Sequence, residues 1–412
     1  MSASLGIKTN FYSKMKSVVI HIFHRDLRLE DNLGLQKALQ KNIALLPLFI
    51  LTPEQFTEQN KYRSENSIQF MLESLKDLDK QLDNKLTVIA ATQMEALLSL
   101  KNQYNIKAIS ENRDYTPYAK KRETETLLFC TQFDIEYLIT DDAYLNIPGS
   151  IVNKSGKPYQ KFTPFYNAAK EKPVQHPVKT PKFKNLIKAP QSIEIPNSQK
   201  NPEIHQHGGT SEALKLLEIL PKDYDSTKDH PSIPTSNLSA HNHFGTVSIR
   251  TVYYALNNIE FRRQLYWREF YGQIVYSFES LYGEDPYTFQ NTPPKTWSTD
   301  VKEFQKWTDG KTGHTLVDAA MMQLKKSGYI HNRARLMAAV YLTKHLKIYW
   351  RWGERHFAKH LVDYDFAQNF GNWCWVASVL PFSQAPFRSM DPEVQLKKYD
   401  RDHIYVNTWL KR

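Results

Sequence analysis

The apolar residues of the chain follow two different periodicities. Short runs rich in β-branched or apolar residues occupy 18–23, 44–51, 86–91, 108–110 and 135–138, and segments with helical apolar spacing, such as 67–82 and 94–104, alternate with them. Strands that alternate with helices are typical of a parallel sheet, because each parallel connection needs a crossover that a helix can supply. The pattern predicts an α/β domain with a Rossmann-like parallel sheet over residues 17–150.

A long segment separates this domain from a helical one. Residues 151–209 are loop-like, and from residue 170 they are rich in Lys, Pro, Asn and Gln with few periodic apolar positions, which is typical of a connector. From residue 210 helical apolar spacing predicts helices at 246–256, 261–281, 316–327, 332–349 and 354–362. We therefore expect an N-terminal extension over 1–16, the α/β domain, a connector over 151–209 and an all-helical domain over 210–412.

Composition and charge narrow the functional classes. The apolar runs are shorter than the ~18 residues of a membrane-spanning helix, and the polar N-terminal segment lacks the apolar core of a signal peptide. A cytoplasmic or nuclear protein is therefore expected, neither secreted nor membrane-bound. The 54 basic residues outnumber the 43 acidic ones, and the formal net charge of +11 favours a polyanionic partner, with nucleic acid as the first candidate.

The sequence disfavours metal chemistry and the common nucleotide loops. Cys130 and Cys374 are the only cysteines, and they lie too far apart for metal-ligand spacing, so no metal site is expected. No glycine occurs between Gly34 and Gly149, which excludes the common Gly-rich phosphate loops from the α/β domain. A redox cofactor is therefore expected elsewhere in the chain.

Aromatic and polar residues concentrate late in the chain. All eight tryptophans stand at or after position 267, and residues 363–375 bring acid, amide and indole groups together. On a helix, Asn369 and Trp373 are four residues apart and share one face. An amide that can contact a ring edge then stands beside an indole that can donate an electron. This arrangement suits a large aromatic cofactor.

Five motifs carry a family resemblance. They are His24–Asn32, Arg263–Tyr271, Thr312–Met321, Gly328–Arg335 and Asp363–Trp375. Together they resemble the DNA photolyase and cryptochrome family, most of all a class I cyclobutane pyrimidine dimer photolyase, over nearly the whole chain. The resemblance implies an enzyme that binds FAD in its helical domain, fully reduced when active. It also implies UV-damaged DNA as the partner and a monomeric protein.

The resemblance assigns a set of residues to FAD. The family's Thr-Ser-Arg-Leu-Ser loop, which would hold the phosphates and the ribityl chain, has Asn237 in place of Arg. Asn369 is the expected neighbour of flavin N5, and Arg335 is expected to pair with Asp363. The full set is Tyr224, Thr235, Ser236, Asn237, Leu238, Ser239, Phe261, Arg335, Asp363, Tyr364, Asp365 and Asn369.

The resemblance also assigns residues to electron transfer and to DNA. Trp297, Trp350 and Trp373 match the three tryptophans that relay electrons to a photoexcited flavin. Trp267 and Trp375 match the aromatic walls around a pyrimidine pair flipped out of the duplex, where stacking returns ~1 to 3 kcal/mol per base. The expected DNA contacts are Gln264, Trp267, Arg268, Asn332, Arg333, Trp375, Arg388 and Gln395.

Three positions bear on which lesion is repaired. Asn332 matches enzymes for cyclobutane dimers, whereas enzymes for the (6-4) photoproduct carry His there and at the position of Leu336. An imidazole acid is needed in the (6-4) reaction because a proton must reach the lesion with the electron. Gln264 points the other way, since cyclobutane-dimer enzymes mostly carry Glu there. Cyclobutane-dimer repair is expected, with Gln264 taking part in catalysis, and a (6-4) photolyase is the alternative.

Two further questions stay open at this point. A cryptochrome-like photoreceptor without repair activity is a rival from another class, although the chain ends at Arg412, shortly after Trp409, and a signalling tail is not expected. A second, light-harvesting chromophore is possible in the α/β domain near residues 112–117. The sequence does not decide between a folate, a deazaflavin and no antenna.

Overall fold

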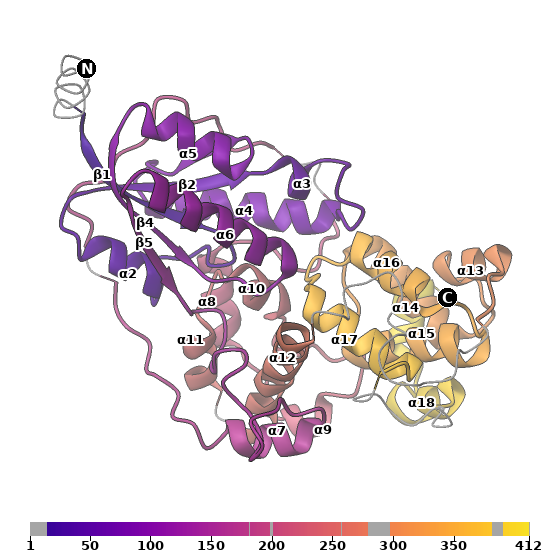
Figure 1. Cartoon of the computed structure of the whole chain (residues 1–412). Helices are drawn as coiled ribbons and strands as arrows, with labels where there is room; N and C mark the ends of the chain where they lie inside the picture. Colours follow the sequence, from indigo (N-terminus) through magenta and orange to yellow (C-terminus); the bar gives the residue numbers. More distant parts are fainter. Residues whose placement is uncertain are drawn as a thin grey trace.

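The N-terminal half of the chain folds around a five-stranded parallel sheet (Figure 1). The computed structural model describes residues 15–180, 182–197, 201–256, 258–278, 297–380 and 390–411. The strands are β1 (Ser17–Phe23), β2 (Ala44–Leu51), β3 (Thr87–Ala90), β4 (Asn105–Asn112) and β5 (Glu136–Thr140) in the order β3-β2-β1-β4-β5. Central β1 is buried after its first residue, as expected for a parallel strand covered on both faces.

Helices cover both faces of this sheet, which confirms the predicted α/β fold. The connections carry α2 (Leu33–Leu39), α3 (Pro53–Phe56), α4 (Glu65–Gln81), α5 (Gln93–Lys101) and α6 (Pro117–Gln132). The strand order reverses beside β1, because β2 and β3 follow on one side and β4 and β5 on the other. The carboxyl ends of β1 and β4 therefore meet at a topological switch point, where polar side chains gather.

The segment 151–209 is more structured than its composition predicts. It carries α7 (Phe162–Ala169), whose buried Phe162 and Phe165 pack on helix α12 (Ile259–Ser277). Farther along, the backbone N–H of Leu45 at the start of β2 donates to the Asn185 carbonyl, and that of Ile187 donates to the Leu45 carbonyl. These contacts join residues far apart in sequence, so periodicity within the segment did not reveal them.

The C-terminal part is all-helical, as predicted. Its helices are α8 (Thr210–Glu218), α9 (Tyr224–Thr227), α10 (Ser239–Phe244), α11 (Ile249–Ala255), α12, α13 (Val301–Thr308), α14 (Thr315–Ser327), α15 (Asn332–Val340), α16 (Trp350–His360), α17 (Phe366–Ala377), α18 (Pro392–Tyr399) and α19 (Ile404–Leu410). Within the described ranges, none of them has the length and apolar content needed to cross a bilayer.

The helix predicted over 332–349 was wrong. The α-helix α15 ends at Val340, and a π-helical turn follows over Tyr341–His345. Lys347 then adopts a left-handed conformation with φ of 55°, which ends helical winding before α16 begins at Trp350. The predicted helix over 261–281 is observed as α12, and residues 279–281 lie outside the described residues.

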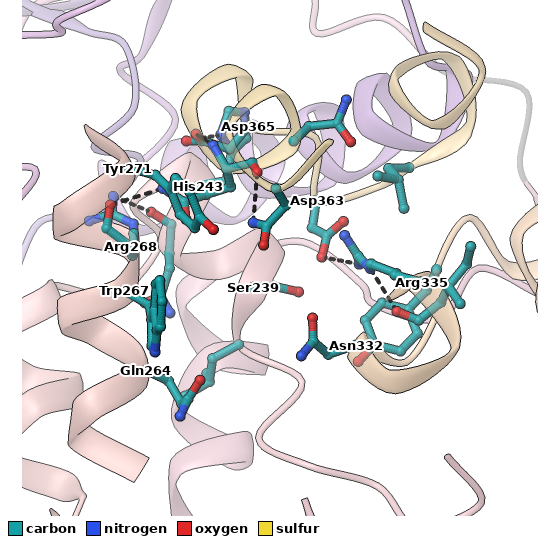
Figure 2. Close-up of a pocket in the computed structure, with 18 of the residues that line it drawn as sticks. Ser239, His243, Gln264, Trp267, Arg268, Tyr271, Asn332, Arg335, Asp363 and Asp365 are labelled. Carbon is teal, nitrogen blue, oxygen red and sulfur yellow. Dashed lines mark hydrogen bonds and ion pairs between the residues drawn. The ribbon is translucent and has the colours of Figure 1, made fainter. Parts of the chain in front are cut away.

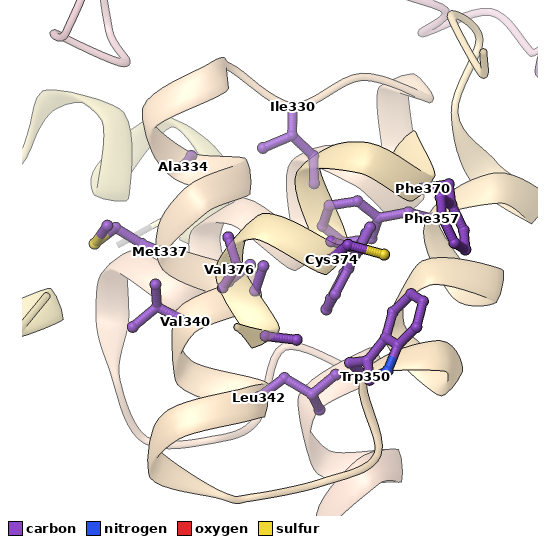
Figure 3. Close-up of a cluster of buried hydrophobic side chains, with 14 of the residues drawn as sticks. Ile330, Ala334, Met337, Val340, Leu342, Trp350, Phe357, Phe370, Cys374 and Val376 are labelled. Atoms are coloured by element: carbon purple, nitrogen blue, oxygen red, sulfur yellow. The ribbon is translucent and has the colours of Figure 1, made fainter. Parts of the chain in front are cut away.

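The helical part has its own apolar core, built mainly by α14 to α17 (Figure 3). Trp350, Phe370 and Cys374 are at most 1% exposed. Gly353 is required where α16 crosses α17, because a Cβ atom there would lie 2.2 Å from the Trp373 ring. The close approach of these helices brings two tryptophan-bearing segments together.

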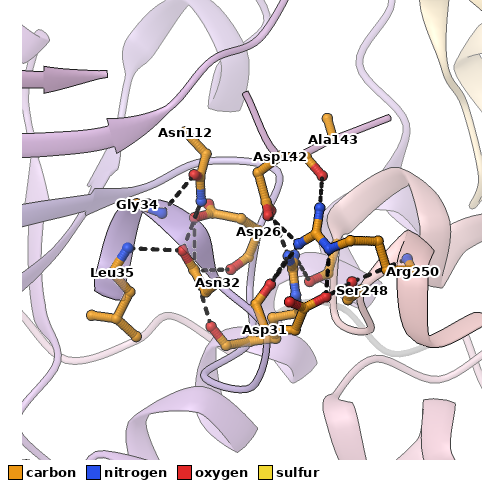
Figure 4. A network of polar contacts seen from close by, with 12 residues as sticks. Asp26, Asp31, Asn32, Gly34, Leu35, Asn112, Asp142, Ala143, Ser248 and Arg250 are labelled. Atoms are coloured by element: carbon orange, nitrogen blue, oxygen red, sulfur yellow. Dashed lines mark hydrogen bonds and ion pairs between the residues drawn. The ribbon is translucent and has the colours of Figure 1, made fainter. Parts of the chain in front are cut away.

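A buried polar network joins the two parts of the molecule (Figure 4). Arg250 of α11 donates from Nε to Asp31 at 2.7 Å and from Nη2 to Asp142 at 2.6 Å, and all three side chains are almost fully buried. Arg28 also pairs with Asp142. Breaking such a pair by removing one partner costs about 3 to 5 kcal/mol, so the network sets how the domains meet.

Candidate cofactor and substrate site

A cavity of about 480 Å³ opens in the helical part (Figure 2). Its lining comes from α10, α11, α12, α15, α16 and α17 and from the segments between them, and it combines apolar side chains with a few polar groups, which is typical of a ligand site. Many of the residues assigned from the sequence line it: Ser236, Leu238, Ser239, Phe261, Gln264, Trp267, Arg268, Asn332, Arg335, Asp363, Asp365, Asn369, Trp373 and Trp375.

Arg335 and Asp363 form the predicted ion pair at one side of the cavity. Arg335 Nη2 lies 2.7 Å from Asp363 Oδ2, and Asp363 is buried. Among the residues that the structure describes, the buried Asp363 Oδ1 has no hydrogen-bond partner. A buried carboxylate oxygen without a partner is costly, so this atom is suited to accept from an N–H or O–H group of a ligand.

Asp365 is kept ionised partly by an arginine of the α/β domain. Its side chain caps the N-terminus of α17, and it pairs with Arg25, which follows β1, and with His243 of α10. Burial alone would raise the pKa of Asp365, but the Arg25 guanidinium and the His243 ring outweigh it and hold the pKa well below its usual value. The cavity therefore contains a fixed negative charge at neutral pH.

Asn369 is oriented by a buried glutamate. Its Nδ2 donates to the Glu354 carbonyl at 3.1 Å and to Glu354 Oε1 at 2.9 Å. Burial raises the pKa of Glu354 to about 7, although the Asn369 hydrogen bond opposes the rise. Because the amide nitrogen is used in these bonds, the Asn369 oxygen is left to accept from a donor in the cavity.

The loop 235–239 reaches the cavity with three of its five residues. Ser236, Leu238 and Ser239 line it, whereas Thr235 and Asn237 do not. Asn237 is left-handed, with φ of 53°, and its Oδ1 lies 3.1 Å from Nε2 of His205. Asn adopts this conformation more readily than most residues, which is consistent with Asn at this position.

The mouth of the cavity has an aromatic wall. Trp267 stacks on Phe162 of α7 with ring centroids 3.6 Å apart and planes 5° apart, so its position is fixed from behind. Trp375 also lines the cavity, from α17, and Asn332 is exposed at its edge. Gln264 donates to the backbone carbonyl of Glu260 at 3.2 Å. Two half-buried indoles on different helices can therefore contact one flat ligand.

Two of the three arginines predicted to contact DNA bond to other parts of the protein. Arg268 donates to the carbonyls of Ala143 and Asn242 and lies over the Tyr144 ring. Arg333 pairs with Asp229 at 2.5 Å and donates to Gln395 at 3.2 Å. Arg388 lies outside the described residues. Both arginines are therefore held in place by contacts within the protein.

Each of the three predicted relay tryptophans contacts other aromatic rings. Trp373 lines the cavity and packs edge-on against Phe357 at 5.1 Å. Trp350 contacts Phe370 at 5.6 Å and Tyr349 at 6.3 Å, and Tyr349 lies 6.3 Å from Trp297. Trp350 and Trp297 thus share Tyr349 as a neighbour, and Trp373 lies at the cavity.

Two residues assigned to FAD stand behind the lining. Tyr224 stacks on Phe261 at 3.9 Å, and Phe261 in turn faces the cavity. Tyr364 is stacked on Tyr62 of the α/β domain at 6.0 Å. Tyr224 therefore supports a lining residue, whereas Tyr364 contacts the α/β domain.

The family profile described as "FAD binding domain of DNA photolyase" matches residues 261–412, and that described as "DNA photolyase" matches residues 19–182. The deoxyribodipyrimidine photo-lyase of Synechococcus is 31% identical, with 96% of this chain and 88% of the relative covered. The chain belongs to the DNA photolyase family. The corresponding enzyme of Alkalihalophilus pseudofirmus is 32% identical over 94% of this chain and 86% of the relative.

Solved structures of photolyases agree with this assignment. The photolyase from Sulfolobus tokodaii, determined with two FAD molecules, has a TM-score of 0.86 at 33% identity and covers 96% of this chain and 90% of its own. The class III photolyase from Agrobacterium tumefaciens has a TM-score of 0.88 at 29% identity, with 96% and 87% covered. A cryptochrome from Synechocystis, with a TM-score of 0.84 at 25% identity and 96% and 89% covered, is also similar. The predicted photolyase enzyme and FAD cofactor are confirmed.

Sequence reasoning missed several residues that shape this photolyase site. Arg25 was expected only as part of the motif His24–Asn32, and no role was predicted for Glu354, His243 or Phe162. Glu354 had no clear signal, because it stands beside Arg355 in a helix rich in charged residues. Phe162 had none, because its contact with Trp267 joins residues far apart in the chain.

Proposed function

We propose that the protein repairs cyclobutane pyrimidine dimers in DNA, driven by light. FAD bound in the cavity supplies light absorption and, when reduced, an electron for the lesion. Arg335, Asp363 and Asp365 would hold the polar edge of the flavin, and the loop 235–239 its phosphate side. The donor set fits, because the Asp363 Oδ1 and the Asn369 oxygen can accept from ring N–H groups.

The Asn369 geometry suits the reduced cofactor. A reduced flavin carries an N–H at N5, whereas an oxidised one has an acceptor nitrogen there. The Asn369 amide nitrogen donates to Glu354, so the Asn369 amide oxygen is the group that can accept a hydrogen bond from the N5–H of a reduced flavin. This preference supports the proposal that the protein acts with fully reduced FAD.

The single observation that carries the substrate assignment is the pairing of Trp267 and Trp375 on one cavity. Two indole faces can clasp the flat rings of a flipped pyrimidine pair, and stacking offsets the few kcal/mol needed to extrude it. The net charge of +11 favours DNA as the partner. The protein is proposed to bind UV-damaged DNA as a monomer.

The proposed lesion class follows from the residues at the edge of the cavity. Asn332 stands at its exposed edge and Leu336 lines it, and neither can donate the proton that the (6-4) reaction requires. Gln264 also lines the cavity and, as an amide, is compatible with a (6-4) photolyase. A cryptochrome-like photoreceptor remains the candidate from another class, because a cryptochrome is among the similar structures.

Lesion binding by Trp267→Ala tests this proposal. Loss of one stacking face should weaken binding to dimer-containing duplex by about tenfold to a hundredfold, while binding to undamaged duplex changes little. Trp352→Ala, which removes a half-buried indole of α16 packed against Phe304, is the matched control and should leave both affinities unchanged. Equal losses on both DNAs for Trp267→Ala would contradict the proposal.

A further inference from the structure

The end of the 151–209 segment is attached to the loop that lines the cavity. Residues 201–209 run along α4 and α14, where the Gly208 N–H donates to Glu73 and the His205 N–H donates to the Ser327 carbonyl. Within this stretch the Gln206 side chain is only 3% exposed. A buried amide in a segment of this composition needs a structural or functional reason.

Gln206 makes two hydrogen bonds to residues that adjoin the cavity. Its Oε1 accepts from the backbone N–H of Ala240 at 3.0 Å, and its Nε2 donates to Ser239 Oγ at 3.2 Å. A backbone N–H can only donate, so the oxygen of the Gln206 amide must face Ala240. The same constraint turns the NH₂ group toward Ser239.

The orientation of Gln206 determines the direction of the Ser239 hydroxyl. An NH₂ group can only donate, so Ser239 Oγ must accept from Gln206, and the single hydroxyl proton of Ser239 is left for another acceptor. Ser239 lines the cavity, and its oxygen is seen inside the cavity in Figure 2. The hydroxyl is therefore prepared to donate to a ligand oxygen in the cavity.

We infer that Gln206 is a positioning residue for FAD: it orients the Ser239 hydroxyl as a hydrogen-bond donor to a phosphate oxygen of the cofactor. Phosphate oxygens only accept, so a hydroxyl with its proton directed at the ligand is the form they require. The inference rests on the proposed function in one respect, because it takes FAD with its diphosphate at the loop 235–239 as the ligand.

A double-mutant cycle on FAD release tests the inference. The rate of FAD dissociation from the loaded protein is followed by the fluorescence of released FAD for Gln206→Met, Ser239→Ala and the double variant. Each single change should raise release about tenfold, as expected for one charge-assisted hydrogen bond, and the double variant should match the single ones. Additive effects, near a hundredfold in the double variant, would overturn the inference.

A matched variant distinguishes positioning of Ser239 by Gln206 from a role of Gln206 in merely attaching the segment 201–209. Gln69 is also a buried glutamine, and its Oε1 accepts from the Asn201 N–H at 2.6 Å, so it ties the same segment to α4 away from the cavity. Gln69→Met should lower the Tm without changing FAD release. If it raises release as much as Gln206→Met does, Gln206 has only a structural role and the inference fails.

A second variant covers the case in which Gln206→Met does not fold. Gln206→Glu keeps the acceptor for Ala240 but places an acceptor opposite Ser239, which turns the hydroxyl proton away from the cavity. FAD release from this variant should also rise at least tenfold, and unchanged release would overturn the inference. Dimer repair by the wild-type protein tests the proposed function separately, since none of these comparisons depends on it.

Discussion

Glu354 shows how the site depends on a single buried atom pair. Its Oε1 accepts from Asn369, while its Oε2 has no partner among the residues that the structure describes. A carboxyl group in this position is more stable when protonated, and its pKa is about 7. Glu354 therefore orients Asn369, but ionisation of its carboxyl group at higher pH destabilises the folded protein.

This ionisation predicts a pH-dependent stability. The folded pKa of Glu354 lies above its ordinary value of 4.5, so unfolding releases a proton between pH 4.5 and 7, and the free energy of unfolding falls as pH rises through that window. Glu354→Gln keeps the acceptor for Asn369 and removes the charge. It should be more stable than wild type at pH 8, by on the order of 3 kcal/mol, and equal to it near pH 4.

Urea denaturation at both pH values, with the FAD concentration held constant, measures this difference. Glu203→Gln, an exposed carboxylate in the 151–209 segment, is the control and should change stability by less than about 0.5 kcal/mol at either pH. A Glu354→Gln variant that loses stability at pH 8 would show that the ionised carboxylate is the favoured native form.

Among the elements, α16 and α17 hold Glu354 and Asn369 and two of the predicted relay tryptophans. Trp350 begins α16 and Trp373 lies on α17, and the two helices cross closely at Gly353. The sequence predicted the helical character of both segments from apolar spacing and the shared face of Asn369 and Trp373 from their separation. It did not predict where the helix over 332–349 breaks, because the π-helical turn and left-handed Lys347 depend on the packing around them.

The proposed electron relay through Trp350 predicts a selective loss of photoreduction. Trp350→Phe removes an oxidisable ring of that relay and should slow light-driven reduction of oxidised FAD at least tenfold. Repair by protein that has been reduced chemically beforehand should be unchanged, because that reaction does not use the relay. Trp409→Phe, which changes a half-buried indole of α19, is the control and should photoreduce at the wild-type rate.

Absorbance of bound FAD during illumination with an external reductant follows this reaction. Wild-type photoreduction in the Trp350→Phe variant would show that electrons reach the cavity by another set of rings. If repair by chemically reduced protein is lost as well, the substitution has damaged the cavity itself.

For the whole molecule, the α/β part acts as a support for the helical site. Arg25 pairs with Asp365, and Arg250 joins Asp31 to Asp142 across the contact between the two parts. The sequence predicted both architectures, since each follows from local periodicity. It did not predict the pairing of Arg25 with Asp365, which are 340 residues apart, because burial and charge pairing across domains leave no periodic signal.

The interdomain network predicts a large destabilisation on loss of one partner. Arg250→Met removes the cation and leaves Asp31 and Asp142 buried without it, which should lower the free energy of unfolding by about 3 to 5 kcal/mol. Chemical denaturation measures this change, and Arg262→Met, a half-buried arginine on α12 that stacks on Tyr253, is the control with a smaller expected loss. A change below about 1 kcal/mol for Arg250→Met would show that the network adds little to the contact between domains.

The central claim concerns what the assembled molecule does to damaged DNA. The most direct measurement is repair by the purified, reduced protein on two duplexes, one with a cyclobutane pyrimidine dimer and one with a (6-4) photoproduct, each in light and in darkness. The account predicts light-dependent loss of the cyclobutane dimer, no loss in darkness and no repair of the (6-4) photoproduct. Repair of the (6-4) photoproduct instead, or no repair of either lesion in light by protein with reduced FAD, would contradict it.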